Sequence, residues 1–300
     1  MPARLGETAG LLTSLFFAIN SVFITRAGQR VGAVVSNRTR VLFALLYLIL
    51  LNILLYRQPL AFDAEPAHWG WLSLSGIIGL ALGDALLFES YLSVGPRLGN
   101  LLLSLSPVFA ALEAWLFIGE RLGTWQVLGM LLALGGIVWV LLERRDRREP
   151  LPQHVTAGIL LGVLSALCQA TGFLFSRRGL YDGFPPIQGN AIRMLAAAVI
   201  LIVIALFQRQ VGPTLGTLRA NPDALRLLML AAFVGPVVGV SLSLFAVQNA
   251  QVGVASTLTS LTPVFMLPIS VLVFKERLNW QAVLGTLVAM LGVAVLFLAG

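Results

Sequence analysis

Five charged side chains lie inside long apolar stretches of this 300-residue sequence: Arg40, Asp84, Glu89, Glu113 and Arg193. A charge at the centre of a membrane helix costs roughly 2.5–3.5 kcal/mol on insertion scales, so each one requires a partner or a function. A guanidinium group binds a carboxylate through two parallel hydrogen bonds. These residue types therefore predict either ion pairs that lock helices together or gates and contacts for a carboxylate substrate.

The positions of these charges along their apolar stretches predict which of them meet. We expect Arg40 near one membrane face, paired with Asp84 or Glu89, and Glu113 paired with Arg193 near the other face. Asp84 and Glu89 point to different sides of one helix, so only one of them is expected to face the interior. An acid in a low-dielectric span can bind and release a proton, which makes Glu113 a candidate for proton coupling.

Uncharged polar side chains and two prolines extend the candidate site. Asn100, Asn190 and Gln248 are candidates for substrate contacts, although such groups also form interhelical hydrogen bonds, and both roles stay open. Pro107 and Pro263 lack the amide N–H of a helix interior and are expected to kink their helices. No phosphate-binding loop and no metal-ligand motif occurs, so we predict neither a metal nor a cofactor.

The composition places these residues in a membrane. The chain is 58% hydrophobic and only 11% charged, whereas a soluble domain carries about 25% charged residues. A net charge of +7 would suggest a nucleic-acid partner in a soluble protein. Here most arginines lie in linkers or at the ends of apolar stretches, as is usual in membrane proteins. We therefore predict a multi-pass protein of the cell membrane, surrounded by lipid and without a nucleic-acid partner.

Ten apolar stretches are long enough to cross a bilayer. Their expected bounds are 8–26, 34–55, 70–92, 98–118, 124–142, 156–176, 187–207, 225–247, 253–274 and 280–298. Only helices satisfy their backbone hydrogen bonds in lipid from such runs, so the predicted fold is an all-α bundle of ten transmembrane helices. The longest polar linkers are Arg57–His68, Glu143–His154 and Gln208–Asp223, and no soluble domain fits between the spans.

The two halves of the chain repeat. The segment Ser104–Gly129 reads SLSPVFAALEAWLFIGERLGTWQVLG, and Ser260–Gly285 reads SLTPVFMLPISVLVFKERLNWQAVLG, without a gap. Further matches join Gly79 to Gly235, Gly83 to Gly239, Asn37 to Asn190 and Arg40 to Arg193. The predicted halves are residues 1–145 and 156–300, joined by a linker at 146–155, with five spans each. Because five is odd, the second half enters the membrane from the opposite side, as in the inverted repeats of transporters.

The paired segments Pro107–Leu122 and Pro263–Leu278, together with five spans per half and this length, resemble the drug/metabolite transporter superfamily in its EamA branch. The resemblance covers residues 8–298. It implies a ten-helix carrier with a central cavity that moves small metabolites or drugs, often outward. It also implies cytoplasmic termini, whereas Lys and Arg are more frequent at the end opposite the termini, so the orientation stays open.

These features predict a secondary transporter and no enzyme. We expect an exporter of small metabolites, amino-acid-like or other carboxylates, that works by alternating access with protons as the candidate coupling ion. One alternative is an exporter of drug-like cations, which would use an unpaired acid such as Glu113. A second is a multi-pass membrane enzyme, which would need a cluster of His, Asp or Glu at one membrane face. The sequence leaves open whether the chain acts as a monomer or a homodimer.

Overall fold

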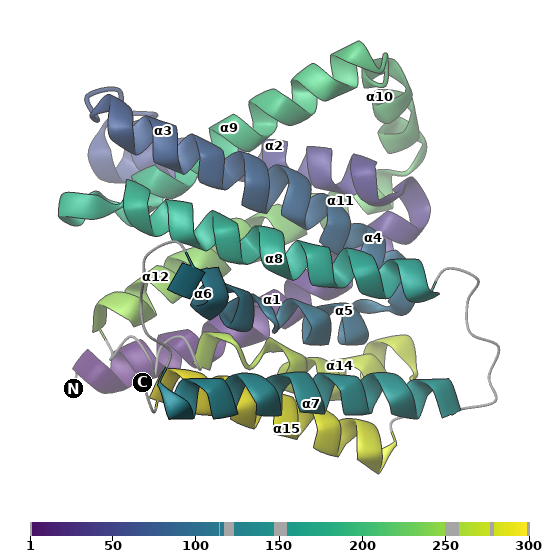
Figure 1. The fold of residues 1–300 in the computed structure, drawn as a ribbon. Coiled ribbons are helices and arrows are strands. Elements are labelled where there is room, and N and C mark those ends of the chain that lie inside the picture. Colours follow the sequence, from purple (N-terminus) through teal and green to yellow (C-terminus); the bar gives the residue numbers. More distant parts are fainter. Residues whose placement is uncertain are drawn as a thin grey trace.

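The computed structural model describes residues 2–113, 115–116, 123–146, 155–249, 258–276 and 279–298, and within these ranges it contains helices and no strand. Seven of the described helical segments are long and apolar enough to cross a membrane. Two shorter apolar helices cover Thr262–Phe274 and Trp280–Leu296. The prediction of an all-α membrane protein is therefore confirmed (Figure 1).

The described part of the first half of the chain consists mainly of helices, several of them joined by short turns. They are α1 (Pro2–Val31), α2 (Ala33–Tyr56), α3 (Pro66–Ser75), the π-helix η1 (Gly76–Gly83), α4 (Asp84–Val94), α5 (Pro96–Leu103), α6 (Ser106–Glu113) and α7 (Thr124–Asp146). Single glycines reverse the chain in two of the turns. Gly32 has φ 82° between α1 and α2, and Gly95 has φ 85° between α4 and α5, a region that side chains with a Cβ rarely adopt.

The described part of the second half follows a similar plan and adds two short elements, η3 and α10. Its elements are α8 (Val155–Gly179), the short 3₁₀-helix η3 (Tyr181–Gly183), α9 (Pro186–Phe207), α10 (Val211–Ala220), α11 (Pro222–Ala232), the π-helix η4 (Phe233–Gly239), α12 (Val240–Asn249), α14 (Thr262–Phe274) and α15 (Trp280–Leu298). Helix α10 lies in the stretch that we expected to be only a polar linker. Leu218 on α10 packs against the hydrophobic cluster to which Ala224 and Leu228 of α11 belong, and this packing anchors the short helix.

The two matched prolines begin helices instead of kinking them. Pro107 is the second residue of α6, after a turn at Ser104 and Leu105. Pro263 is the second residue of α14. At these positions the missing proline N–H removes no helical hydrogen bond, because the first N–H groups of a helix have no partner within it. The prediction of interior kinks was wrong, since the chain breaks just before each proline.

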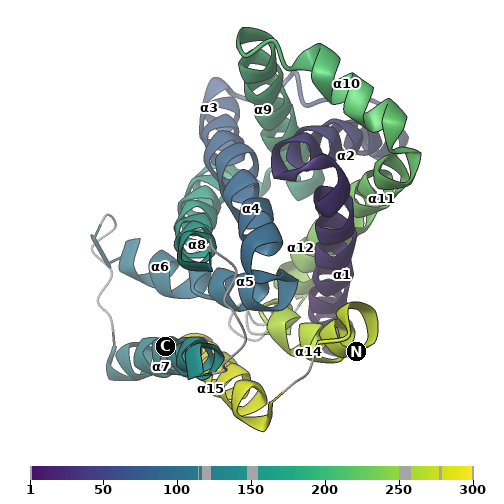
Figure 2. The ribbon, with the colours of Figure 1, turned by 90° about the vertical axis from the view of Figure 1, so that its right-hand side faces the viewer.

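The first helix of each half packs against helices of the other half. Helix α8 packs against α3, η1, α4, α5 and α6, and α1 packs against α11, η4, α12 and α14. Helices α7 and α15 lie side by side at the edge of the bundle (Figures 1 and 2). A methyl group added at Gly136 on α7 would lie 2.4 Å from the backbone nitrogen of Ala289 on α15. The two backbones are therefore in contact, as small residues allow between membrane helices.

Stacked aromatic rings connect the segment between α8 and α9 to the start of α3. The imidazole of His68 is stacked between the rings of Tyr181, at 4.1 Å, and Phe184, at 4.4 Å. Its Nδ1 lies 2.8 Å from the carbonyl oxygen of Gly179. The Tyr181 hydroxyl donates to Glu65 Oε2 at 2.5 Å, and this hydrogen bond raises the pKa of Tyr181. The contact joins the two halves at the ends of their apolar helices.

Candidate functional site

Asp84 is the centre of a buried polar cluster. It is the first residue of α4, directly after η1, and it is buried. Its Oδ2 forms an ion pair with Nη2 of buried Arg40, and its Oδ1 accepts a hydrogen bond from Gln169 Nε2 at 2.8 Å. The Arg40 guanidinium also lies 5.1 Å from the centroid of the Phe88 ring. Both carboxylate oxygens are therefore occupied, and the expected pairing of Arg40 with Asp84 is found.

Arg193 on α9 is the second cation at this carboxylate. It is partly exposed, and it attracts Asp84 electrostatically. Its guanidinium makes no hydrogen bond to any residue in the described part of the chain, and its Nε is buried without a partner there. The position in the second half that matches Asp84 is Val240, at the offset that relates Gly83 to Gly239. Among these three residues, Asp84 pairs with Arg40 and attracts Arg193 without a hydrogen bond to it, so two guanidinium groups accompany one carboxylate and the cluster carries surplus positive charge.

Glycines bring these helices close enough for the cluster to form. A methyl group added at Gly76 of η1 would lie 2.1 Å from the Arg193 carbonyl oxygen, so η1 and α9 are in backbone contact beside the cluster. Gln169 and Ser165 on α8 donate to the carbonyl oxygens of Gly79 and Gly83 on η1, at 3.3 and 2.8 Å. Such side-chain donors satisfy carbonyl groups that the wider π-helical turn leaves free.

Each π-helix accepts hydrogen bonds from an asparagine, and the two asparagines occupy matching positions in the two halves. Asn37 on α2 donates from Nδ2 to the carbonyl oxygens of Leu80 and Ala81, at 3.3 and 3.0 Å. Asn190 on α9 donates from Nδ2 to the carbonyl oxygen of Pro236 in η4, at 3.3 Å. Asn190, which we expected as a substrate contact, therefore makes an interhelical hydrogen bond to a π-helix. Neither π-helix was predicted from the sequence, although the matched glycines and Pro236 mark where they lie.

The expected pair of Glu113 with Arg193 is wrong. Glu113 at the end of α6 is buried, and its Oε1 accepts a hydrogen bond from Thr171 Oγ1 of α8 at 2.6 Å. Its Oε2 is buried without a hydrogen-bond partner among the residues that the structure describes. Helix α8 packs against α6 as well as against η1 and α4. Thr171 meets Glu113 while Gln169 meets Asp84, so the two acids contact different residues of α8 and Arg193 interacts with Asp84 instead.

Asn100 completes a chain of hydrogen bonds beside Arg40. Its Oδ1 accepts from the Tyr91 hydroxyl at 3.1 Å. Its Nδ2 donates to Ser21 Oγ at 2.9 Å and to the carbonyl oxygen of Pro96 at 2.7 Å. Asn100 thus connects α5 to α4 and α1, and both of its N–H groups already have partners. Its place in the structure is that of an interhelical hydrogen bond.

The remaining candidates lie outside the cluster. Glu89 on α4 is exposed, so the alternative in which Arg40 pairs with Glu89 is wrong. Gln248 belongs to α12, but its side chain is outside the described part of the chain. Within the described ranges, no group of three or more His, Cys, Asp or Glu side chains is placed to hold a metal ion.

Buried charges and polar contacts inside a bundle of apolar helices define a polytopic membrane protein with a polar interior. The family model of EamA-like transporters matches residues 4–142 and 156–298. The chain therefore belongs to the EamA-like transporter family, whose members are multi-pass membrane transporters of the drug/metabolite type. It is accordingly a multi-pass protein of the cell membrane.

Individual proteins agree with this membership. An uncharacterized protein of Pseudomonas aeruginosa is 35% identical over 207 residues, which cover 68% of this chain and 66% of that protein. An uncharacterized transporter of Haemophilus influenzae is 30% identical over 166 residues, which cover 54% and 52%. The chain thus spans between about half and two thirds of the length of these curated relatives. A solved crystal structure, described only as that of a protein, shares the fold with a TM-score of 0.60 at 17% identity, covering 99% and 98% of the two chains.

Proposed function

We propose that the chain is a secondary transporter that works by alternating access between two inverted five-helix halves, residues 1–145 and 156–300. Three observations support this proposal. Helices α1 and α8 begin at opposite ends of the bundle (Figure 1). The π-helices η1 and η4 occupy matching places in the two halves and receive hydrogen bonds from the matching Asn37 and Asn190. Each first helix packs within the other half, which gives the halves a shared interface that can rock.

We further propose that the transported molecule is a small metabolite with a carboxylate group, such as an amino acid. The observation that carries this proposal is the surplus guanidinium of Arg193. Asp84 already binds Arg40 and Gln169, so it does not neutralise the positive charge of Arg193, which can attract a second anion. A carboxylate matches the planar fork of a guanidinium and would supply the hydrogen bonds that Arg193 lacks among the described residues. A substrate that completes this pairing neutralises the cluster during transport.

Glu113 is the proposed site of proton coupling. Its buried Oε2 has no partner among the described residues, and its nearest polar contact is the neutral hydroxyl of Thr171. A carboxyl group in such a place can take up a proton on one side of the membrane and release it on the other. Inward movement of protons would then drive export. Glu113 also favours one second candidate function, the export of organic cations, because an anionic carboxylate that has no cation partner among the described residues attracts them.

Metabolite profiling tests the proposed function. The medium and the cell extract are compared by mass spectrometry for cells that express the wild-type chain or its Arg193→Gln variant. We expect one class of carboxylate to accumulate outside only with the wild type. Equal export by both forms would return Arg193 to a structural role. An unchanged profile with both forms would reject the export of native metabolites, and accumulation of cations alone would favour the second candidate.

A further inference from the structure

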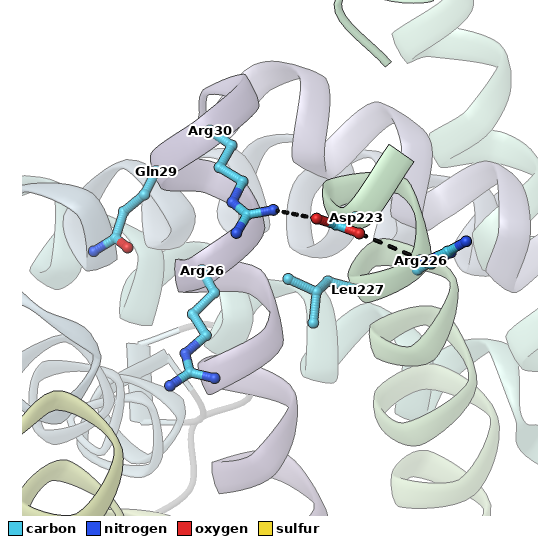
Figure 3. A pocket seen from close by; sticks show the side chains of 6 residues that line it. All are labelled: Arg26, Gln29, Arg30, Asp223, Arg226 and Leu227. Atoms are coloured by element: carbon cyan, nitrogen blue, oxygen red, sulfur yellow. Dashed lines mark hydrogen bonds and ion pairs between the residues drawn. The ribbon is translucent and has the colours of Figure 1, made fainter. Parts of the chain in front are cut away.

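A charged pocket lies apart from the cluster at Asp84, between the end of α1 and the start of α11. It has a volume of about 470 Å³ and is lined by Arg26, Gln29, Arg30, Asp223, Arg226 and Leu227 (Figure 3). On each helix the lining residues follow the spacing i, i+3 and i+4, which places them on one face. Two helix faces thus meet to form the pocket.

The pocket holds more positive than negative charge. Asp223 is shared by two arginines, since its Oδ2 lies 3.2 Å from Arg30 Nη1 and its Oδ1 lies 3.6 Å from Arg226 Nη1 (Figure 3). Arg26 contacts no carboxylate in the described part of the chain, and its Nη2 donates only to the carbonyl oxygen of Val273, at 3.5 Å. Two guanidinium groups therefore pair with Asp223, while the guanidinium of Arg26 is turned away from this carboxylate (Figure 3). With three guanidinium groups and one carboxylate among its lining residues, the pocket favours an anion as the ligand.

The pocket lies at the ends of two apolar helices. The apolar span that contains α1 ends at Val31, and the apolar span that contains α11 begins at Pro222. In a bilayer, the pocket between these two ends would therefore lie near the membrane–water interface. Arg226, Leu230 and Phe233 follow one another at i, i+4 and i+7, and both apolar side chains are 49% exposed. This face offers a guanidinium at headgroup depth and, below it, an apolar track for an acyl chain.

We propose that this pocket binds the phosphate of an anionic phospholipid, with an acyl chain along Leu230 and Phe233. Basic pockets between membrane helices bind anionic headgroups, and a guanidinium fork matches a phosphodiester. A headgroup with net negative charge, as in phosphatidylglycerol, suits the surplus of guanidinium groups. A zwitterionic headgroup carries a cationic group of its own, which the surplus guanidinium groups would repel, so it should bind less tightly. The apolar track distinguishes a lipid from free phosphate.

Native mass spectrometry of the purified full chain tests the proposal. The probes are phosphatidylglycerol and phosphatidylcholine with identical acyl chains, offered in equal amounts. We expect the wild type to retain phosphatidylglycerol several-fold more than phosphatidylcholine, and the triple variant Arg26→Gln, Arg30→Gln and Arg226→Gln to lose this preference. A triple variant that keeps the preference would overturn the proposal.

A matched control removes three exposed arginines outside the pocket, through Arg57→Gln, Arg209→Gln and Arg219→Gln. We expect this control to keep the preference, because the change in net charge is the same while the pocket is intact. If the control loses the preference as well, lipid binding follows net charge alone and the pocket assignment is wrong.

Two further measurements separate the lipid from other anions and guard against misfolded variants. Asp223→Asn removes the competing carboxylate, so we expect it to increase retention of phosphatidylglycerol, a gain that misfolding would not produce. Inorganic phosphate at millimolar concentration should leave retention unchanged. Displacement of the lipid by phosphate would make the pocket a site for soluble anions and overturn its assignment to a lipid.

Discussion

The contact between α7 and α15 gives a prediction that two neighbouring glycines can test. Gly135 and Gly136 are adjacent on α7, but only Gly136 faces α15. A methyl group added at Gly136 would lie 2.4 Å from the Ala289 nitrogen and 2.6 Å from the Gly285 carbonyl oxygen. A methyl group added at Gly135 would meet no heavy atom within 4 Å. Gly136→Ala therefore strains the contact, and Gly135→Ala is its matched control.

The expected magnitude follows from the atoms that would collide. The colliding atoms at Gly136 belong to the α15 backbone and cannot rotate away, so the helices must separate by about 1 Å to restore ordinary contact distances near 3.4 Å. Overpacking of this kind costs about 1–3 kcal/mol. Both substitutions gain the same helix propensity, up to ~1 kcal/mol for Gly to Ala. That gain cancels in the comparison, so Gly136→Ala should be less stable than Gly135→Ala by about 1–3 kcal/mol.

The assay is reversible unfolding of the purified chain in mixed micelles. Increasing mole fractions of sodium dodecyl sulfate unfold the protein, and circular dichroism reports the remaining helix. The free energies of unfolding of Gly135→Ala and Gly136→Ala are then compared under the same conditions. Equal values for the two variants would refute the close contact of α7 with α15 and the magnitude derived from it.

Three further substitutions probe the site and the connection between the halves. Asp84→Asn leaves the buried guanidinium of Arg40 without its acid and removes the carboxylate that attracts Arg193, so the free energy of unfolding should fall by about 3–5 kcal/mol; an unchanged value in the micelle assay would contradict the buried ion pair with Arg40. His68→Ala removes two ring contacts and one hydrogen bond, worth about 2–4 kcal/mol together, and should expose the connection at Tyr181 to protease; unaltered proteolysis would contradict the stacked arrangement. Glu113→Gln keeps the hydrogen-bonding shape but cannot titrate, so the pH dependence of transport should flatten; a pH profile identical to that of the wild type would reject proton coupling at this residue.

The sequence predicted the bundle and its internal repeat because both depend on local properties. A span is recognised from consecutive apolar residues, and the matched segments follow from residue identity alone. The pair of Arg40 and Asp84 was one of two alternatives, since a charge inside a span requires a partner. Helical spacing separated Asp84 from Glu89, and the structure shows which of the two is buried.

The misplaced pair of Glu113 and Arg193 shows what sequence spacing cannot supply. Counting residues along each span located both near one face, but the partner of a side chain depends on which helices are neighbours. Backbone contact at Gly76 brings α9 against η1, so Arg193 lies close enough to attract Asp84 electrostatically, while α8 supplies Thr171 to Glu113. The π-helices were missed because a change of helical pitch depends on tertiary hydrogen bonds. Matched glycines were the available signal, and they were interpreted only as sites of close packing.

The central claim is that Arg193 binds the carboxylate of a transported metabolite. Counterflow in proteoliposomes tests it most directly, with a mixture of labelled amino acids and other small carboxylates as probes and their uncharged amides for comparison. We predict saturable exchange of at least one carboxylate but not of its amide, reduced about 10- to 100-fold by Arg193→Gln, since a charged hydrogen bond contributes about 1.5–3 kcal/mol. Arg209→Gln, an exposed arginine outside the cluster, should exchange like the wild type. Undiminished exchange by Arg193→Gln would contradict the account.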